Sequence, residues 1–103
     1  MAAELLKLSG EIDLNEKSNV VAQLDPLIQK KPRLLVIDLA QVTYVDSSGL
    51  AIFIDALQRV KKYGGNLVLA ALQDNVRMVF EIARLDQIFQ IFPNSEEALR
   101  KSG

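Results

Sequence analysis

The sequence predicts an α/β protein in which a mostly parallel β-sheet of about four strands is flanked by about four helices. Three observations lead to this prediction. Short apolar runs alternate with amphipathic segments, an order typical of parallel strands joined by right-handed helical crossovers. Residues 34–39 are apolar at nearly every position, as in a strand buried on both faces. The 103 residues fit a single domain, residues 1–103, and show no repeat or linker.

The first half of the chain is predicted to form a strand, a helix and the central strand. The first strand is expected around residues 5–8, where the turn residues Ser9-Gly10 end it. A helix covers about residues 14–31, because apolar residues recur there at helical spacing. Proline lacks a backbone donor and clashes with the preceding turn, so at Pro26 we expect a kink, or two short helices with Asp25 capping the second. The apolar pattern stays in phase across Pro26, which favours the kink.

The second half adds three helices and two strands. Beyond residues 40–45, to which the pattern assigns no element, a helix begins near Leu50 and ends at Gly64-Gly65, because glycine accepts the left-handed conformation of a C-terminal cap. A strand over residues 66–72 is followed by a helix that begins at Asp74. A short strand at residues 88–92 and a helix at residues 98–101 close the chain.

The composition excludes several classes of function. The chain has no Cys and no His, which removes thiolate nucleophiles, disulfides, Cys/His metal sites and every catalytic triad that contains imidazole. The 12 basic and 13 acidic residues give a net charge of −1, so nucleic acid is not expected as a partner. The N-terminus lacks a signal-peptide pattern, and no stretch approaches the ~20 apolar residues of a membrane span. We therefore expect a cytoplasmic protein with no membrane contact, no enzyme activity, no cofactor and no metal.

Two loops with unusual chemistry are predicted at the carboxyl ends of strands, where parallel sheets meet their ligands. They are residues 9–13 and residues 45–50. Ser47 and Ser48 lie where a strand turns into a helix, so either hydroxyl can be the helix N-cap. A nucleophilic serine would need a histidine base that the chain lacks. A phosphorylation site remains as the alternative, because a helix N-terminus stabilises a phosphate through its dipole and unpaired N–H groups.

The residues of these loops resemble the STAS domain of bacterial anti-sigma factor antagonists, which are also called anti-anti-sigma factors. The resemblance runs from about residue 6 to residue 99 and implies a STAS-type fold, with the phosphorylation site at the start of the second helix. It rests on three segments in order, Ser9-Gly10-Glu11-Ile12-Asp13, Asp46-Ser47-Ser48-Gly49-Leu50 and Gly64-Gly65-Asn66-Leu67.

The resemblance implies a partner-switching regulator of transcription without enzymatic activity. In the family, the unphosphorylated form binds an anti-sigma factor, itself a serine kinase, and so frees a sigma factor. Phosphorylation of the serine directly after the aspartate breaks that complex, and a phosphatase restores it. By its position in the motif that serine is Ser47, and Ser48 is the other candidate.

Acidic side chains around Ser47 are expected to form the partner surface. Glu11, Asp13 and Asp46 fall on adjacent loops and would make an acidic rim that fits a basic partner, although a solvated loop also accounts for Glu11. Ile52 lies on the polar side of the second helix, one turn from Ser47, where we expect an exposed apolar contact or a half-buried edge position. The predicted partner contacts are Glu11, Asp13, Asp46, Ser48, Gly49 and Ile52.

The N-terminal end departs from the family pattern. Family members usually begin with a strand that pairs with the strand before the Gly-Glu-Ile-Asp loop, and here only residues 1–6 precede it, so that first strand is short or missing. The strand around residues 5–8 would then keep an exposed edge that invites pairing with another chain. We expect a monomer or a weak dimer.

Two other functions are weighed against the antagonist. A STAS subunit of a lipid-transport ABC system would bind the transporter ATPase without a phosphorylation cycle, but the retained Asp46-Ser47 pair favours the antagonist. A receiver-like domain phosphorylated on aspartate ranks last. It needs an acidic pair after the first strand, a late lysine, and a fifth strand and helix that 103 residues barely accommodate.

Overall fold

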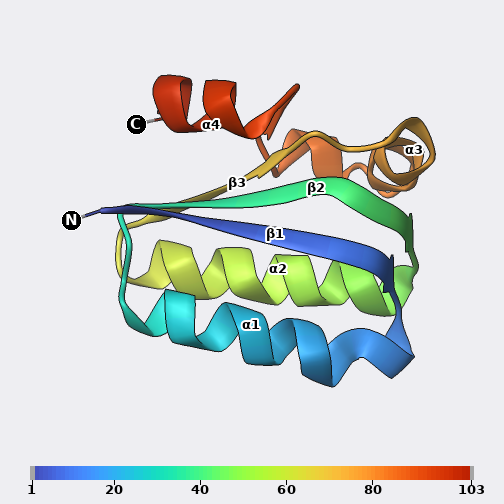
Figure 1. The fold of residues 1–103 in the computed structure, drawn as a ribbon, viewed down its shortest axis with the longest axis horizontal. Coiled ribbons are helices and arrows are strands. Elements are labelled where there is room, and N and C mark those ends of the chain that lie inside the picture. The colour runs from blue at the N-terminus through green and yellow to red at the C-terminus, as the bar shows by residue number, and fades with distance from the viewer. Residues whose placement is uncertain (1, 103) are drawn as a thin grey trace.

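The computed structural model describes residues 2–102 as a parallel sheet with helices on both faces (Figure 1). The sheet consists of β1 (Ala3–Ile12), β2 (Leu34–Val45), β3 (Asn66–Ala70) and β4 (Ile91–Phe92), which lie side by side in that order. The helices are α1 (Lys17–Gln29), α2 (Ser47–Lys62), α3 (Asp74–Ile82) and α4 (Ser95–Ser102). Two short 3-10 helices, η1 (Leu14–Glu16) and η2 (Leu85–Gln87), complete the described chain. The predicted fold class is confirmed.

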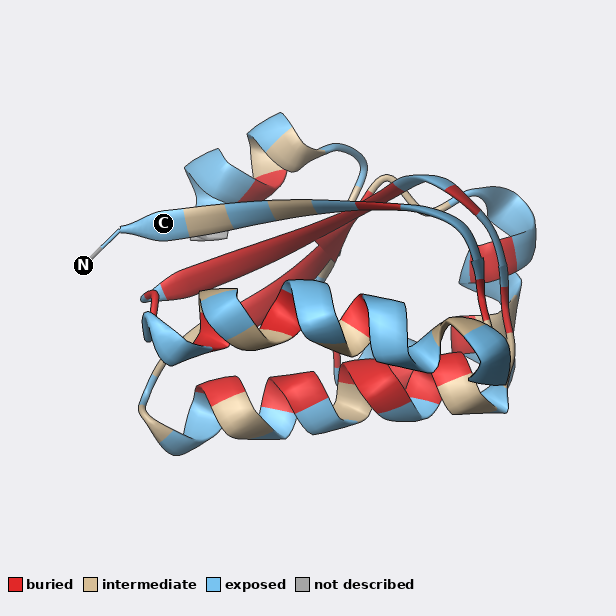
Figure 2. Ribbon diagram, turned by 60° about the horizontal axis from the view of Figure 1, so that its bottom comes forward, coloured by how far each residue is buried: buried red, intermediate tan, exposed pale blue. Residues whose placement is uncertain are grey.

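The helices divide the core into two parts. α1 and α2 cover one face of the sheet, α4 covers the other, and α3 packs against the carboxyl end of β2 (Figure 1). The larger cluster lies on the α1 and α2 side and contains Phe53 and Phe80, whose ring centroids are 5.9 Å apart. A smaller cluster on the α4 side contains Val36 and Ala98. In Figure 2 the middle strands are red along much of their length, which agrees with the prediction that residues 34–39 are buried on both faces.

β1 and β2 both continue past their predicted ends. They pair in parallel from Ala3 with Leu34 to Ile12 with Val45, with register shifts between Lys7 and Ser9 and between Gly10 and Glu11. The prediction that residues 9–13 form a loop is therefore wrong for residues 9–12. Irregularities in the pairing accommodate the turn-forming Ser9-Gly10 pair inside the strand.

The first helix is continuous through Pro26, so the alternative of two short helices with Asp25 as a cap is wrong. A single helix agrees with the apolar pattern that stays in phase across the proline. The Asp25 Oδ1 atom instead accepts a hydrogen bond from Arg59 Nη1 at 2.7 Å, which joins α1 to α2. Because both side chains are more than one-third exposed, this pair adds little to stability.

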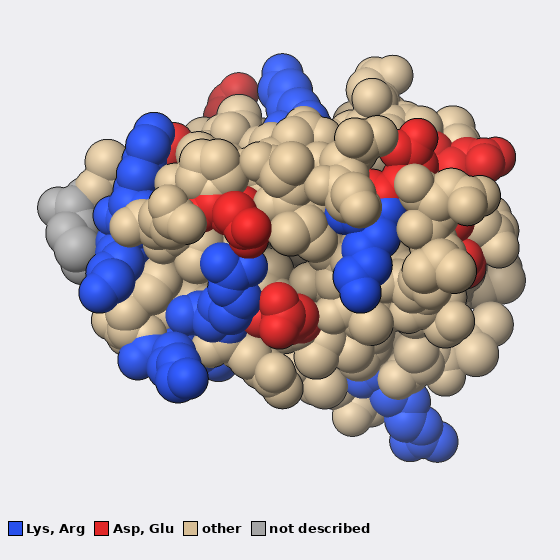
Figure 3. All heavy atoms as spheres, turned by 90° about the horizontal axis from the view of Figure 1, so that it is seen from below, with Lys and Arg blue, Asp and Glu red and all other residues tan. Residues whose placement is uncertain are grey.

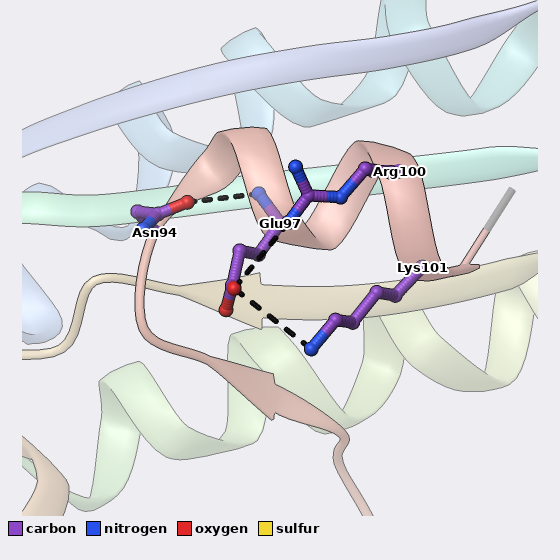
Figure 4. A network of polar contacts seen from close by, with 4 residues as sticks. All are labelled: Asn94, Glu97, Arg100 and Lys101. Carbon is purple, nitrogen blue, oxygen red and sulfur yellow. Dashed lines mark hydrogen bonds and ion pairs between the residues drawn. The ribbon is translucent and has the colours of Figure 1, made fainter.

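Identifiable caps mark the end of α2 and the start of α4. Gly64 has a φ of 89° just after α2 ends, which confirms the expected left-handed glycine. α4 begins at Ser95, three residues earlier than predicted, because Asn94 Oδ1 accepts the Glu97 backbone N–H at 2.8 Å. The Glu97 carboxylate then lies 3.4 Å from Arg100 Nη2 and 3.8 Å from Lys101 Nζ (Figure 4).

A buried carboxylate ties α4 to the sheet. Asp38 lies in the middle of β2 and is the one charged residue of the described chain that is buried. Its Oδ1 atom accepts the Ala40 N–H at 2.9 Å, and its Oδ2 atom accepts a hydrogen bond from the Ser95 hydroxyl. Both carboxylate oxygens are therefore satisfied.

β1 lies at one edge of the sheet, as predicted from the short N-terminus. No strand among residues 2–102 pairs with its outer side. Lys7 and Glu11 are exposed on this strand, and charged side chains on an edge strand oppose pairing with another chain. The expectation of a monomer or a weak dimer stays a prediction.

Candidate functional site

The candidate site is built where β1 and β2 end together. Ile12 is in register with Val45, and the Asp46 N–H donates to the Ile12 carbonyl oxygen at 3.3 Å. The segment that enters α2 therefore starts beside the segment that enters η1. This pairing brings Asp13 and Asp46, which are 33 positions apart in the chain, to neighbouring places at the carboxyl edge of the sheet.

Asp46 is the N-cap of α2. Its backbone is extended, and its Oδ1 atom accepts the Gly49 N–H at 3.0 Å while its carbonyl oxygen accepts the Leu50 N–H at 2.9 Å. The alternative in which Ser47 or Ser48 is the cap is therefore wrong. Because the carboxylate does the capping, both serine hydroxyls are left for other roles.

The two serines differ in exposure. Ser47, the first residue of α2, is exposed. Ser48 is half-buried and lines a groove of about 380 Å³ between α1 and α2, together with Lys17 and Arg59. Only Ser47 therefore presents a hydroxyl on the open surface of this turn.

The predicted acidic rim is present in part. Asp13 caps η1 by accepting the Glu16 N–H at 3.1 Å, so its carboxylate, like that of Asp46, is engaged with backbone. Glu11 is exposed on β1 opposite Tyr44. The structure thus brings Glu11, Asp13 and Asp46 to one edge, while their role as partner contacts stays a prediction.

Gly49 is required by packing. A Cβ atom at this position would lie 2.4 Å from the Ile12 carbonyl oxygen and 2.9 Å from Val45 Cγ1. Only glycine allows the first turn of α2 to approach the paired ends of β1 and β2 this closely. Gly49 is buried, and its contribution to the site is to allow this close packing.

Ile52 is only 5% exposed, so both expectations for it, an exposed contact and a half-buried edge position, are wrong. α2 is covered by the sheet on one side and by α1 on another, so its buried arc is wider than a single apolar stripe. Ile52 lines the α1–α2 groove beside Val21 and Leu24 of α1.

Sequence reasoning missed the exposed apolar residues at this edge. Leu14 follows the capping Asp13 and is 67% exposed, and Tyr44 near the end of β2 is 48% exposed. The available signal was an isolated leucine between two polar residues, Asp13 and Asn15, and a tyrosine just before the Asp-Ser-Ser-Gly segment.

Charge is distributed unevenly along the strand direction. Figure 3, which views the α1 and α2 face, shows side chains of both charges in one half of this face and a group of Asp and Glu at the end of the other half. The acidic residues of the carboxyl edge, which also carries Lys17 and Arg77, are Glu11, Asp13, Glu16, Asp46 and Asp74. The basic residues around the opposite edge, which also carries Glu4, are Lys30, Lys31, Arg33, Lys61 and Lys62. The candidate site therefore lies in a mainly acidic region.

No three of the described His, Cys, Asp and Glu residues are grouped so that they could hold a metal ion. Within residues 2–102, no helix is both long and apolar enough to cross a membrane.

Comparisons with known proteins agree with this architecture. Residues 3–98 match the STAS domain family. The anti-sigma-B factor antagonist of Listeria monocytogenes is 36% identical over 84 residues, which cover 82% of this chain and 74% of that protein. The anti-sigma-B factor antagonist of Bacillus subtilis strain 168 is 34% identical over 91 residues, which cover 88% and 83% of the two chains.

The fold is similar to that of the anti-sigma factor antagonist SpoIIAA of Bacillus. Its unphosphorylated form superposes with a TM-score of 0.81 at 19% identity, covering 99% of this chain and 90% of that one. Its phosphorylated form gives a TM-score of 0.71 at 20% identity, covering 96% and 89%. With the family match over nearly the whole chain and two curated antagonists above 30% identity, this chain belongs to the STAS domain family of anti-sigma factor antagonists.

Proposed function

We propose that this protein is a partner switch controlled by phosphorylation of Ser47. In its unphosphorylated form it binds an anti-sigma factor that is itself a serine kinase, and the bound kinase releases a sigma factor. Transfer of phosphate to Ser47 ends that complex, and a phosphatase regenerates the binding form. The protein acts in the bacterial cytoplasm, where its partners control transcription, and it contributes binding rather than catalysis.

The observation that carries this proposal is the exposed Ser47 hydroxyl beside a cap that does not use it. Asp46 holds the first turn of α2, so a kinase can reach Ser47 without breaking the helix start. Two antagonists of anti-sigma-B factor share more than 30% identity with the chain, and the relative SpoIIAA has a phosphorylated form.

Electrostatics gives the switch a mechanism. A phosphate on Ser47 brings about −1.5 to −2 charges to an edge that already carries Glu11, Asp13 and Asp46. The dipole of α2 favours that charge at its N-terminus, so the fold tolerates the modification. A partner surface that matches the uncharged serine then meets a larger, highly charged group, and the complex weakens.

Ser48 is the weaker candidate for phosphorylation. Its side chain points into the α1–α2 groove, half-buried beside Ile52, where a kinase would have to reach past α1. Lys17 and Arg59 also line this groove, so a phosphate there would have cations nearby, but exposure favours Ser47.

The experiment is a phosphorylation assay with the anti-sigma serine kinases of the source organism and ATP. We expect one kinase to add a single phosphate, located on Ser47 by mass spectrometry and lost in Ser47→Ala. Ser48→Ala is the matched control and should be phosphorylated at the wild-type rate. Phosphate found only on Ser48, or modification by none of these kinases, would reject the proposal.

A further inference from the structure

We infer that four exposed apolar side chains at the carboxyl edge form the anchors by which the anti-sigma factor docks. We call Leu14, Tyr44, Met78 and Ile82 the carboxyl-edge patch. The inference rests on the proposed function and extends it, because it assigns the contact surface to η1, β2 and α3 in addition to the start of α2.

The patch residues are exposed to a degree that is unusual for their type. Met78 is 57% exposed and Ile82 is 77% exposed, while Leu14 and Tyr44 are about two-thirds and one-half exposed. Only three other large apolar side chains of the described chain, Leu5, Ile88 and Leu99, are exposed in this way. Clustered exposed apolar groups are typical of protein–protein contact sites.

Contacts between elements bring the patch residues to one edge. Tyr44 is in register with Glu11, and β1 leads from there through Asp13 to Leu14. On the other side of Tyr44, Asn75 Nδ2 donates to the Thr43 carbonyl oxygen at 2.7 Å, which fixes the start of α3 beside the end of β2. Both ribbon views show α3 at the end of the molecule where β1 and β2 turn into their helices (Figures 1 and 2).

The outer face of α3 continues this surface. Asn75, Met78 and Ile82 are spaced by three and four positions, so they lie along one side of the helix. The opposite side is held in the core by Val76 and Phe80. Since Asn75 contacts Thr43, which directly precedes Tyr44, Met78 and Ile82 extend the patch along α3 from the end of β2.

The charges at this edge identify the kind of occupant. The acidic residues at this edge, Glu11, Asp13, Glu16, Asp46 and Asp74, outnumber the basic residues Lys17 and Arg77, so the partner needs apolar groups with mainly basic ones around them. A symmetric dimer through this surface would set the same acidic groups of two copies against each other. The occupant is therefore a different protein. Leu14 and Tyr44 lie at the same paired strand ends as Ser47, and this makes the occupant the anti-sigma factor.

The chain offers a matched pair of isoleucines for the test. Ile82 lies in the patch, whereas Ile88, 58% exposed, lines a hollow with Leu57, Lys61 and other residues of the far half of α2. The far half of α2 is about 15–20 Å along the helix from Ser47. Ile82→Ser and Ile88→Ser make the same chemical change at comparable exposure, but only one is in the patch.

The experiment measures the Kd of each variant for the anti-sigma kinase that phosphorylates Ser47, with ADP in place of ATP. We expect Leu14→Ser, Met78→Ser and Ile82→Ser each to weaken binding about tenfold, and Ile88→Ser to bind within about twofold of wild type. Circular dichroism melts confirm that all four variants fold. Sedimentation of the protein alone should give the same mass for wild type and Ile82→Ser.

Three different results would overturn the inference, and each points to a different cause. If Ser47→Asp weakens binding while the three patch variants bind like Ile88→Ser, the patch is not the docking surface but the switch stands. If wild type is a dimer that Ile82→Ser dissociates, the patch belongs to a second copy. If no kinase modifies Ser47, the proposed function fails and the docking inference fails with it.

Discussion

Replacing Gly49 with alanine should destabilise the protein, although the same change usually stabilises a helix. The added Cβ would lie 2.4 Å from the Ile12 carbonyl oxygen, against about 3.3–3.6 Å for a normal carbon–oxygen contact, so α2 or β1 must move by about 1 Å. Forcing extra atoms into a packed site costs about 1–3 kcal/mol. The gain in helix propensity returns about 1 kcal/mol. The obstacle is strand backbone that no rotamer change can clear, which puts the cost at the upper end of that range and leaves a net loss of about 2 kcal/mol.

Urea denaturation followed by circular dichroism measures this loss, and thermal melting should show a decrease of about 8–16 °C in Tm. Ser48→Ala, in the same turn, adds no atom and should stay within about 0.5 kcal/mol of wild type. The displaced helix start would also weaken binding of the anti-sigma kinase. A Gly49→Ala protein at least as stable as wild type would refute the close packing of α2 on the paired strand ends.

Three further perturbations test the switch and the fold. Ser47→Asp should lower affinity for the anti-sigma kinase by about ten- to a hundredfold in calorimetric titrations while Ser47→Ala keeps it, and equal affinities would show that this turn is not the binding surface. Ser95→Ala removes a partner of the buried Asp38 carboxylate and should cost about 1–3 kcal/mol in urea denaturation, whereas an unchanged midpoint would mean that the contact does not hold α4. Burial raises the pKa of Tyr63 above its ordinary 10.0, because the folded protein favours the neutral phenol. The stability that Tyr63 contributes is therefore complete below pH 10.0 and is lost as the pH rises through the folded pKa. Tyr63→Phe should therefore make stability fall less steeply at high pH, and parallel curves for the two proteins would contradict this.

Much of the fold could be predicted from local pattern because the core is strongly apolar. Residues 34–39 are apolar at nearly every position, as in a strand buried on both faces, and α2 has the helical spacing of an amphipathic helix. The extension of β2 to Val45 could not be predicted this way. Past the end of β3, the last residues of β2 pair only with β1 and contact α3. Of residues 40–45, only Val42 and Val45 are buried, a pattern that matches no strand alternation and depends on contacts that sequence spacing does not reveal.

The sequence predicted the position of the candidate site more accurately than its helix cap and the burial of its residues. The motif located Ser47 at the start of α2, but which of three adjacent polar residues caps the helix depends on backbone geometry that only the structure gives. Ile52 was misplaced for a different reason. A helical wheel separates one apolar face from one polar face. In the structure α2 packs against α1 as well as against the sheet, and α1 buries part of the predicted polar side.

The separate roles of Asp46 as the helix cap and Ser47 as the proposed phosphorylation site would let the modification change binding without changing the fold. If Ser47 were the cap, a bulky phosphate would replace the hydroxyl that holds the first turn, and phosphorylation would couple to the stability of α2. Because Asp46 accepts the Gly49 N–H, the helix start keeps its own anchor in both states. In the proposed switch, a phosphate on the exposed Ser47 would add charge at a place that the helix dipole favours. In the proposed switch, the effect of phosphorylation would then fall on the contact with the partner and not on the stability of α2, as a reversible partner switch requires.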